Sequence, residues 1–83
     1  MSKREAIIRL SLILRKLRSK ASTFDEIIDF LMQEGEIQSY NFEISKRTFQ
    51  RDIQDIASIF SIDVAYDFSN RKYYIQEENP AND

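Results

Sequence analysis

Apolar residues recur at intervals of three and four along three stretches of this chain, and they alternate with polar residues in a fourth. In the first stretch, residues 3–18, Ile7, Leu10, Leu14 and Leu17 follow this spacing. Side chains at such intervals share one face of a helix with 3.6 residues per turn. We therefore predict a helix over residues 3–18 with this stripe facing the core.

Two further aliphatic residues of the same stretch, Ile8 and Leu12, lie four positions apart and fall outside that stripe. A lone small domain would have to expose them. We predict that they form a partner or dimer surface, covered by a second copy of the chain or by another domain of a longer protein. The alternative is two isolated exposed aliphatic residues, which are common on protein surfaces.

The second stretch begins at Thr23, which forms a Thr-x-x-Glu capping box with Glu26. Its apolar side follows at helical spacing, and its outer side is acidic. Gly35 is predicted to stop this helix, because glycine commonly follows the last helical residue. The connection from 36 to 44 contains apolar residues and few turn formers, so we predict that it packs against the core.

The third stretch, residues 45–60, begins with Ser45, whose hydroxyl can accept a hydrogen bond from a free backbone N–H group of the first turn. Arginine and amide side chains fall on one side of this predicted helix. Helices that read DNA have this pattern, but so does any amphipathic surface helix. The opposite, apolar side is predicted to be core: Phe49, Ile53, Ile56 and Phe60.

Alternating residues at 62–67, turn formers at 68–71 and strand formers at 72–76 predict a β-hairpin. Asn70 is the residue expected to have a positive φ angle at its tip. Residues 77–83 have no apolar periodicity, and we predict a disordered tail or the start of a linker.

The composition limits the chain to one small domain, expected over residues 1–76, because 83 residues bury only one modest core. One glycine and one proline against ten aromatic residues favour a compact, mostly helical fold. The predicted fold class is mostly α with a small β-hairpin, in the winged helix-turn-helix order of a three-helix bundle plus a two-stranded wing. Such bundles also serve as protein-docking modules, so the order alone leaves the function open.

The chain contains no cysteine and no histidine. Disulfides, thiolate metal sites and imidazole-assisted nucleophiles are therefore excluded, and we expect no enzyme activity and no cofactor. The absence of cysteine fits a cytoplasmic protein. No apolar segment reaches the length of a membrane span, and Arg9 interrupts the first apolar run, which argues against a signal peptide.

Charge is unevenly distributed, although the net charge is only −2. Residues 1–20 hold seven basic residues and one acidic residue, whereas residues 21–44 hold six acidic residues and no basic one. Such segregation can present a basic face to phosphates. A helix that merely pairs with an oppositely charged neighbour is the alternative.

The segment Ser45-Lys46-Arg47-Thr48-Phe49-Gln50-Arg51-Asp52-Ile53 resembles the Ser-x-Arg-Thr-x-x-Arg-Asp-Ile/Leu recognition-helix signature of one regulator family. That family is the N-terminal domains of WYL-domain transcriptional regulators, which are related to DeoR-type winged-helix repressors. Residues 62–67 and 71–75 resemble the wing of the same domains. The connection from 35 to 44 is longer than a tight helix-turn-helix turn. The sensory WYL domain that normally follows is not in this chain, so we expect an excised domain or a short stand-alone relative.

The resemblance implies sequence-specific binding of double-stranded DNA by a bacterial-type transcriptional regulator, with residues 45–60 in the major groove and residues 62–76 on the flanking backbone. The basic residues of the first helix would add electrostatic steering. A homodimer or a C-terminal sensory domain is the expected protein partner, and no membrane is expected. The residues implied for base readout are Lys46, Arg47, Thr48, Gln50 and Arg51, and those for the DNA backbone are Ser45, Ser69, Asn70, Arg71 and Lys72.

Two carboxylates fit the DNA face poorly, because phosphates repel them. We expect Asp52 to turn inward and pair with a basic residue of another helix, and Asp55 to pair with Arg51. The alternative function is a winged-helix module for protein–protein interaction or dimerisation without DNA binding. It is supported by the net negative charge, by the acidic second helix and by Ile8 and Leu12.

Overall fold

The computed structural model describes residues 3–76, which form three helices followed by an antiparallel hairpin. The predicted fold class is confirmed, because this order and pairing are those of a winged helix. The predicted tail at 77–83 lies outside the described residues. The elements are α1 (Lys3–Ser19), α2 (Phe24–Gln38), α3 (Lys46–Phe60), β1 (Val64–Asp67) and β2 (Lys72–Ile75).

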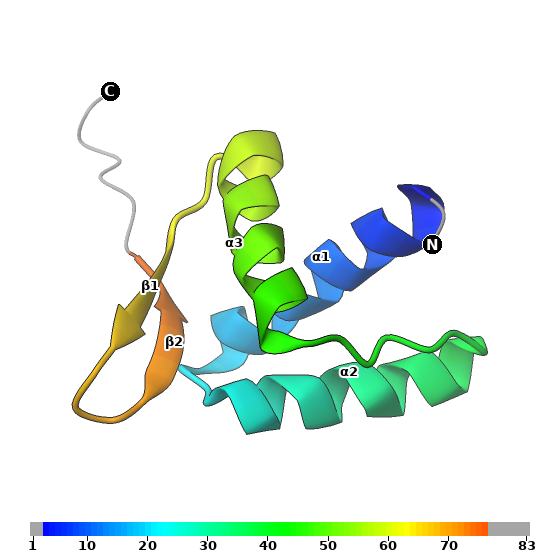
Figure 1. The fold of residues 1–83 in the computed structure, drawn as a ribbon, viewed down its shortest axis with the longest axis horizontal. Coiled ribbons are helices and arrows are strands. Elements are labelled where there is room, and N and C mark those ends of the chain that lie inside the picture. The colour runs from blue at the N-terminus through cyan, green and yellow to red at the C-terminus, as the bar shows by residue number, and fades with distance from the viewer. Residues whose placement is uncertain (1–2, 77–83) are drawn as a thin grey trace.

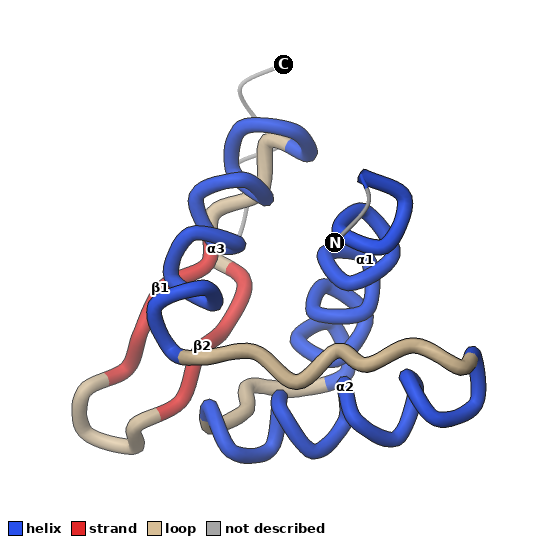
Figure 2. Tube along the Cα trace, turned by 45° about the vertical axis from the view of Figure 1, so that its right-hand side comes forward, coloured by secondary structure: helices blue, strands red, loops and turns tan. Residues whose placement is uncertain are grey.

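Helix α3 stands beside α1, with α2 lying across one end of both, and the hairpin flanks α3 on the side away from the N-terminus (Figure 1, Figure 2). Strand β2 is hydrogen-bonded on both edges. Its partner on one edge is β1, and on the other the N–H and C=O groups of Tyr73 bond those of Ser22 at 2.7 and 3.0 Å. The wing is therefore attached to the connection between α1 and α2.

The core face of α1 is wider than the sequence predicted. Leu12 is only 5% exposed and belongs to the core, and Ile8 is partly buried and packs against it. The prediction that these two residues form an uncovered partner surface is wrong, because α1 packs against α2, α3 and β2 together. Ile7, predicted to be core, is instead 44% exposed.

Helix α2 begins with the predicted capping box. Thr23 Oγ1 accepts a hydrogen bond from the backbone N–H of Glu26 at 3.1 Å, and the Glu26 carboxylate accepts one from the Thr23 N–H at 2.9 Å. The latter bond lowers the pKa of Glu26 below its ordinary value. The helix then continues past Gly35 to Gln38 and ends at Ser39, which has a left-handed φ of 63°. The prediction that Gly35 stops the helix is therefore wrong.

Gly35 instead allows the backbone of Tyr40 to lie close to the helix. The following connection folds back so that its backbone passes over the glycine, and Tyr40 N–H donates to Gly35 O at 2.8 Å. A Cβ atom at position 35 would lie 2.5 Å from the Tyr40 carbonyl oxygen. The connection buries Phe42 completely, so the prediction that it packs against the core is confirmed.

Replacing Gly35 with alanine is expected to lower the free energy of unfolding by about 1–3 kcal/mol, because the added methyl group must displace backbone. Chemical denaturation of both proteins measures this. Gln33→Ala, an exposed change on the same helix, is the control and should alter stability by less than about 0.5 kcal/mol. Equal stability of Gly35→Ala and the parent would show that the connection moves away at no cost.

Candidate nucleic-acid interface

The N-terminus of α3 is capped as the sequence predicted. Ser45 has an extended backbone, and its hydroxyl oxygen accepts a hydrogen bond from Thr48 N–H at 3.1 Å. The same hydroxyl donates to the Thr48 hydroxyl oxygen at 3.2 Å. Helix α3 consequently begins at Lys46, and the predicted reading residues occupy its first two turns.

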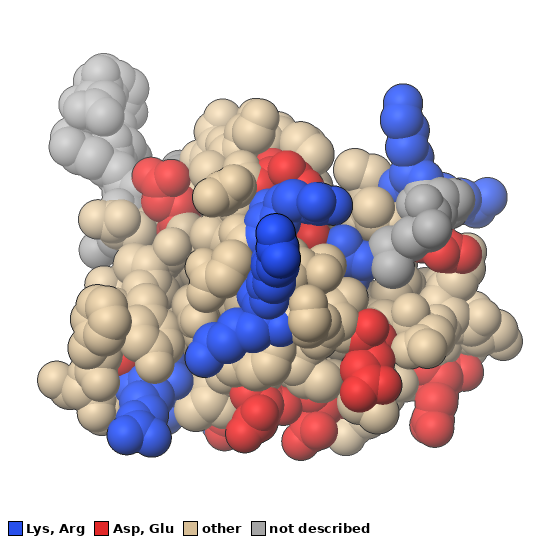
Figure 3. All heavy atoms as spheres, in the orientation of Figure 1, with Lys and Arg blue, Asp and Glu red and all other residues tan. Residues whose placement is uncertain are grey.

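The outward side of α3 presents basic and amide groups, with the exposed carboxylate of Asp55 one turn beyond Arg51. A shallow surface hollow of about 340 Å³ lies along this side, and Figure 3 shows Lys and Arg atoms in a column over α3. Arg47 and Arg51 are exposed there. The structure thus brings together four of the five residues predicted for base readout, with Gln54 beside them. The hollow is lined by Arg47, Thr48, Gln50, Arg51 and Gln54.

Lys46, the fifth predicted reading residue, lies apart from this group. Its ammonium nitrogen is 5.7 Å from the centre of the Phe24 ring, over the start of α2. It also lines two hollows between α3, α2 and the wing. The Lys46 side chain therefore borders the wing and does not line the hollow of the outward side.

Gln50 connects this side of α3 to the wing. Its Nε2 donates a hydrogen bond to the Tyr73 hydroxyl at 3.1 Å, although the residues are 23 positions apart. Sequence reasoning did not identify Tyr73 as part of the site. The available signal was the alternation of a strand, which turns one of Tyr73 and Tyr74 inward; Tyr73 is 4% exposed and Tyr74 39%.

A buried ion pair holds α3 against α1. The Arg9 guanidinium donates two hydrogen bonds to the Asp52 carboxylate, Nε to Oδ2 at 2.7 Å and Nη2 to Oδ1 at 2.8 Å. The two side chains are only 6% and 3% exposed. The prediction that Asp52 turns inward to a base on another helix is confirmed. A bidentate pair of this kind fixes the orientation of one helix relative to the other.

Several basic residues of α1 are less available for contact with DNA than predicted. Arg9 is buried in the pair with Asp52, so it cannot take part in steering. Arg15 lies 3.1 Å from the Glu34 carboxylate of α2, and its guanidinium covers the ring of Phe30. Lys16 lies near the same ring. These contacts support the alternative reading for the middle of α1, in which basic residues pair with the neighbouring acidic helix.

Asp55 is exposed on α3, and the predicted ion pair between Asp55 and Arg51 is not formed within residues 3–76. Among the described residues, the Arg51 guanidinium on the outward side therefore has no carboxylate at salt-bridge distance.

The tip of the wing is organised by Asp67. Its carboxylate accepts hydrogen bonds from the Ser69 and Asn70 backbone N–H groups at 2.9 and 3.3 Å and from the Asn70 side chain at 2.8 Å. These bonds, the one from the Asn70 side chain foremost, lower the pKa of Asp67. The positive φ, 58°, belongs to Arg71, so the prediction that Asn70 has it is wrong. Asn70 instead uses its amide to close the turn.

Of the predicted backbone-contact residues, Ser69, Asn70 and Arg71 are exposed at the tip, and Lys72 is half-buried at the start of β2. Figure 3 shows basic atoms at the wing on the same face of the molecule as the column over α3, with acidic atoms over α2 between and below. The basic groups of α3 and of the wing thus face one side together.

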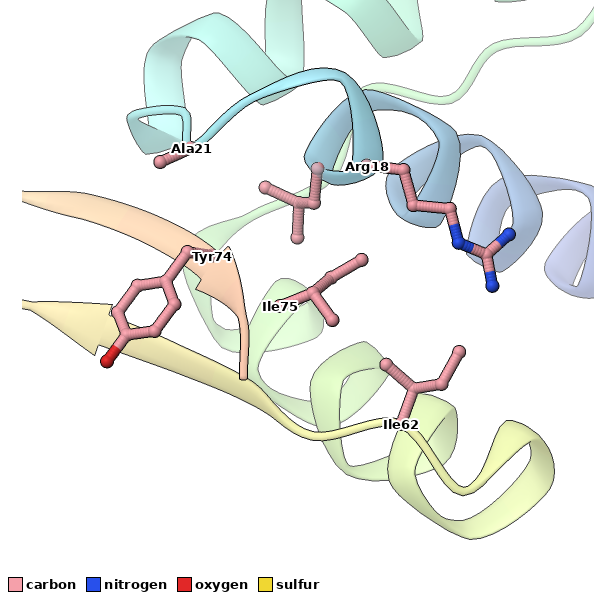
Figure 4. Close-up of a pocket in the computed structure, with 6 residues that line it drawn as sticks. Arg18, Ala21, Ile62, Tyr74 and Ile75 are labelled. Carbon is pink, nitrogen blue, oxygen red and sulfur yellow. The ribbon is translucent and has the colours of Figure 1, made fainter. Parts of the chain in front are cut away.

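Another hollow, of about 570 Å³, lies on a different part of the surface, between the C-terminal end of α1 and β2 (Figure 4). Its lining contains one guanidinium and one phenol and no carboxylate. None of the residues predicted to contact DNA lines it. The lining residues are Leu17, Arg18, Ala21, Ile62, Tyr74 and Ile75.

No protein-family model, no curated protein and no solved structure matches this chain. The resemblance to WYL-domain regulators therefore stays a prediction. Within residues 3–76, no helix is long and apolar enough to cross a membrane. Over the same part of the chain, no three carboxylates are close enough together to hold a metal ion.

Proposed function

We propose that this chain binds double-stranded DNA in a sequence-specific manner, as the DNA-binding domain of a bacterial-type transcriptional regulator acting in the cytoplasm. Helix α3 enters the major groove, and the wing contacts the flanking backbone. The observation that carries the proposal is the outward side of α3, where two arginines and two glutamines line one hollow without a carboxylate.

The chemistry of that hollow matches the edges of base pairs in the major groove. The Arg47 guanidinium can donate two hydrogen bonds to guanine O6 and N7, and a glutamine amide can pair with adenine. The buried pair between Arg9 and Asp52 supports these roles, because a reading helix has to keep its orientation while its side chains contact bases.

The wing supplies the electrostatic part of the proposed interface. Arg71 lies at its tip and Lys72 at the start of β2. Positively charged side chains that neutralise phosphates release counterions from the DNA. Binding by one domain is expected to be weak, since half-sites are usually occupied by a dimer at a spacing of about 34 Å. A homodimer, or a C-terminal sensory domain that dimerises, would supply the second half-site.

The alternative of a protein-interaction module has lost one of its supports. It relied on Ile8 and Leu12 as an uncovered apolar pair, but Leu12 is a core residue and Ile8 packs against the core. The net negative charge and the acidic outer side of α2 still favour that alternative.

A salt titration of duplex binding tests the proposal. The logarithm of the binding constant is expected to fall linearly with the logarithm of salt concentration, with a slope of about −0.9 per neutralised phosphate. Fluorescence anisotropy with a labelled random duplex and with a duplex selected from a random pool measures this. Affinity that does not change with salt would contradict the proposal and favour the protein-interaction alternative.

Two variants separate base reading from backbone contact. Arg47→Ala should weaken the free energy of binding to the selected duplex by about 1–3 kcal/mol, because it removes a base contact. Its effect on binding to random duplex should be much smaller. Lys72→Ala should lower the affinity for both duplexes equally and reduce the salt slope by about one. Arg15→Ala, which removes a guanidinium that is already paired with Glu34 of α2, is the matched control and should change neither the affinity nor the salt slope. Unchanged binding of both variants would contradict the assigned roles.

A further inference from the structure

Phe68 stands out at the tip of the wing because it is a large apolar ring among polar turn residues. It is 85% exposed, the highest value of any large apolar side chain in residues 3–76. A flexible tip could hide such a ring, but this tip is held by the hydrogen bonds to Asp67 described above and by the bond from Arg71 N–H to the Asp67 carbonyl at 2.7 Å. The ring is therefore displayed on a closed turn.

Phe68 is also the last of five aromatic rings, each in contact with the next, that run from α2 through the core to the wing tip. The ring centres are 5.4 Å apart at the inner end, then 4.9, 4.7 and 4.9 Å, and three of the four pairs meet edge to face. Such packing restricts the outermost ring before any ligand arrives and reduces the entropy lost on binding. The order of the rings is Phe24, Phe49, Tyr73, Tyr66 and Phe68.

The open side of this ring series borders a hollow of about 400 Å³ between α3 and the wing. Phe68 and Tyr66 line it from β1 and the tip, and Lys46 and Gln50 line it from α3. Arg71 lines the adjoining hollow together with Lys46 and Tyr66. Flat rings and cationic groups thus line two adjoining hollows, of which the second also includes the Asp25 carboxylate. Rings beside cationic groups suit a polymer of flat bases, sugars and phosphates.

We propose that Phe68 contacts the minor groove of the DNA beside the α3 site, where its ring packs on the sugars and base edges of one base step. This inference rests on the proposed function. With α3 in the major groove, the neighbouring groove at the wing is the minor groove, and apolar side chains presented to it can wedge between base steps. Arg71 and Lys72 hold the phosphates on either side of the ring.

The test compares Phe68→Ala with the parent chain on the selected duplex, by anisotropy and by hydroxyl-radical footprinting. Affinity should fall about tenfold, since an aromatic contact to a base is lost. The salt slope should stay unchanged because no charge is removed, in contrast to Lys72→Ala. Minor-groove protection beside the α3 site should disappear from the footprint, while protection at the α3 site itself remains.

Tyr74→Ala is the matched control, because Tyr74 is an exposed aromatic of the same hairpin that lines the hollow on the other side. It should leave affinity and footprint unchanged. Melting temperatures of both variants check that the hairpin is intact, and Phe68→Leu, which keeps an apolar group at the tip, should recover part of the affinity.

The outcomes distinguish this inference from the proposed function. If the parent binds duplex with the expected salt dependence and Phe68→Ala binds equally well with the same footprint, the minor-groove contact is overturned and the proposed function stands. If Phe68→Ala loses affinity for single-stranded DNA but not for duplex, the ring stacks on unpaired bases and the minor-groove contact is likewise overturned. If the parent shows no salt-dependent duplex binding, both proposals fail.

Discussion

Asp52→Ala is expected to lower the free energy of unfolding by about 3–5 kcal/mol, which is the usual cost of removing one partner of a buried ion pair. The variant deletes the carboxylate that accepts two hydrogen bonds from Arg9, and it leaves the guanidinium in a site that is 6% exposed. Since small domains are stable by only about 5–15 kcal/mol in total, this loss is a large fraction of the free energy of unfolding. Urea denaturation followed by circular dichroism measures the loss.

Two comparisons show whether the ion pair itself is responsible. Asp55→Ala, which removes an exposed carboxylate from the same helix, should change stability by less than about 0.5 kcal/mol. The double variant Arg9→Met with Asp52→Leu should recover most of the lost stability, because apolar replacement of a buried pair is often neutral or stabilising. A single variant Asp52→Ala as stable as the parent would mean that the pair does not hold α3.

Phe49→Ala is also expected to lower the free energy of unfolding by about 3–5 kcal/mol, because it leaves a cavity where a fully buried ring was. Phe49 is 0% exposed and touches the rings of both Phe24 and Tyr73. It is the central connection between α2, α3 and the wing. Its removal should therefore loosen the hairpin in addition to lowering global stability.

Denaturation measures the global effect of Phe49→Ala, and amide hydrogen exchange measures the local one. Protection of β1 and β2 should fall by more than protection of α1. Ile59→Ala on the same helix is the control, since Ile59 is 55% exposed and its loss should cost less than about 0.5 kcal/mol. Equal loss of protection in all elements would show that the ring series does not anchor the wing specifically.

Local features of the chain were predictable because they depend on residues close together in sequence. The spacing of apolar residues identified three helices, and the Ser45 and Thr23 side chains located the starts of two of them to the residue. Alternation identified the hairpin within two residues at either end. The inward turn of Asp52 was predicted as well, because phosphates would repel a carboxylate that stayed on the DNA face.

Other features depended on which elements pack together, and these were decided only by the tertiary structure. Gly35 continues a helix that it was expected to end, because the returning chain needs the space of its missing side chain. Leu12 is buried because three elements cover α1, whereas a single apolar stripe on a helix can predict only one covering surface.

The candidate site likewise has some features that the sequence predicts and others that only the tertiary structure decides. Helical geometry determined from the sequence alone that Arg47 and Arg51 share a side opposite the core, because their relative direction depends only on the rise and turn of one helix. The partner of Asp52, 43 positions away, the bond from Gln50 to Tyr73 and the ring series that ends at Phe68 join separate elements. Only the folded chain decides such contacts, because periodicity describes the faces of an element and not the element that will lie against each face.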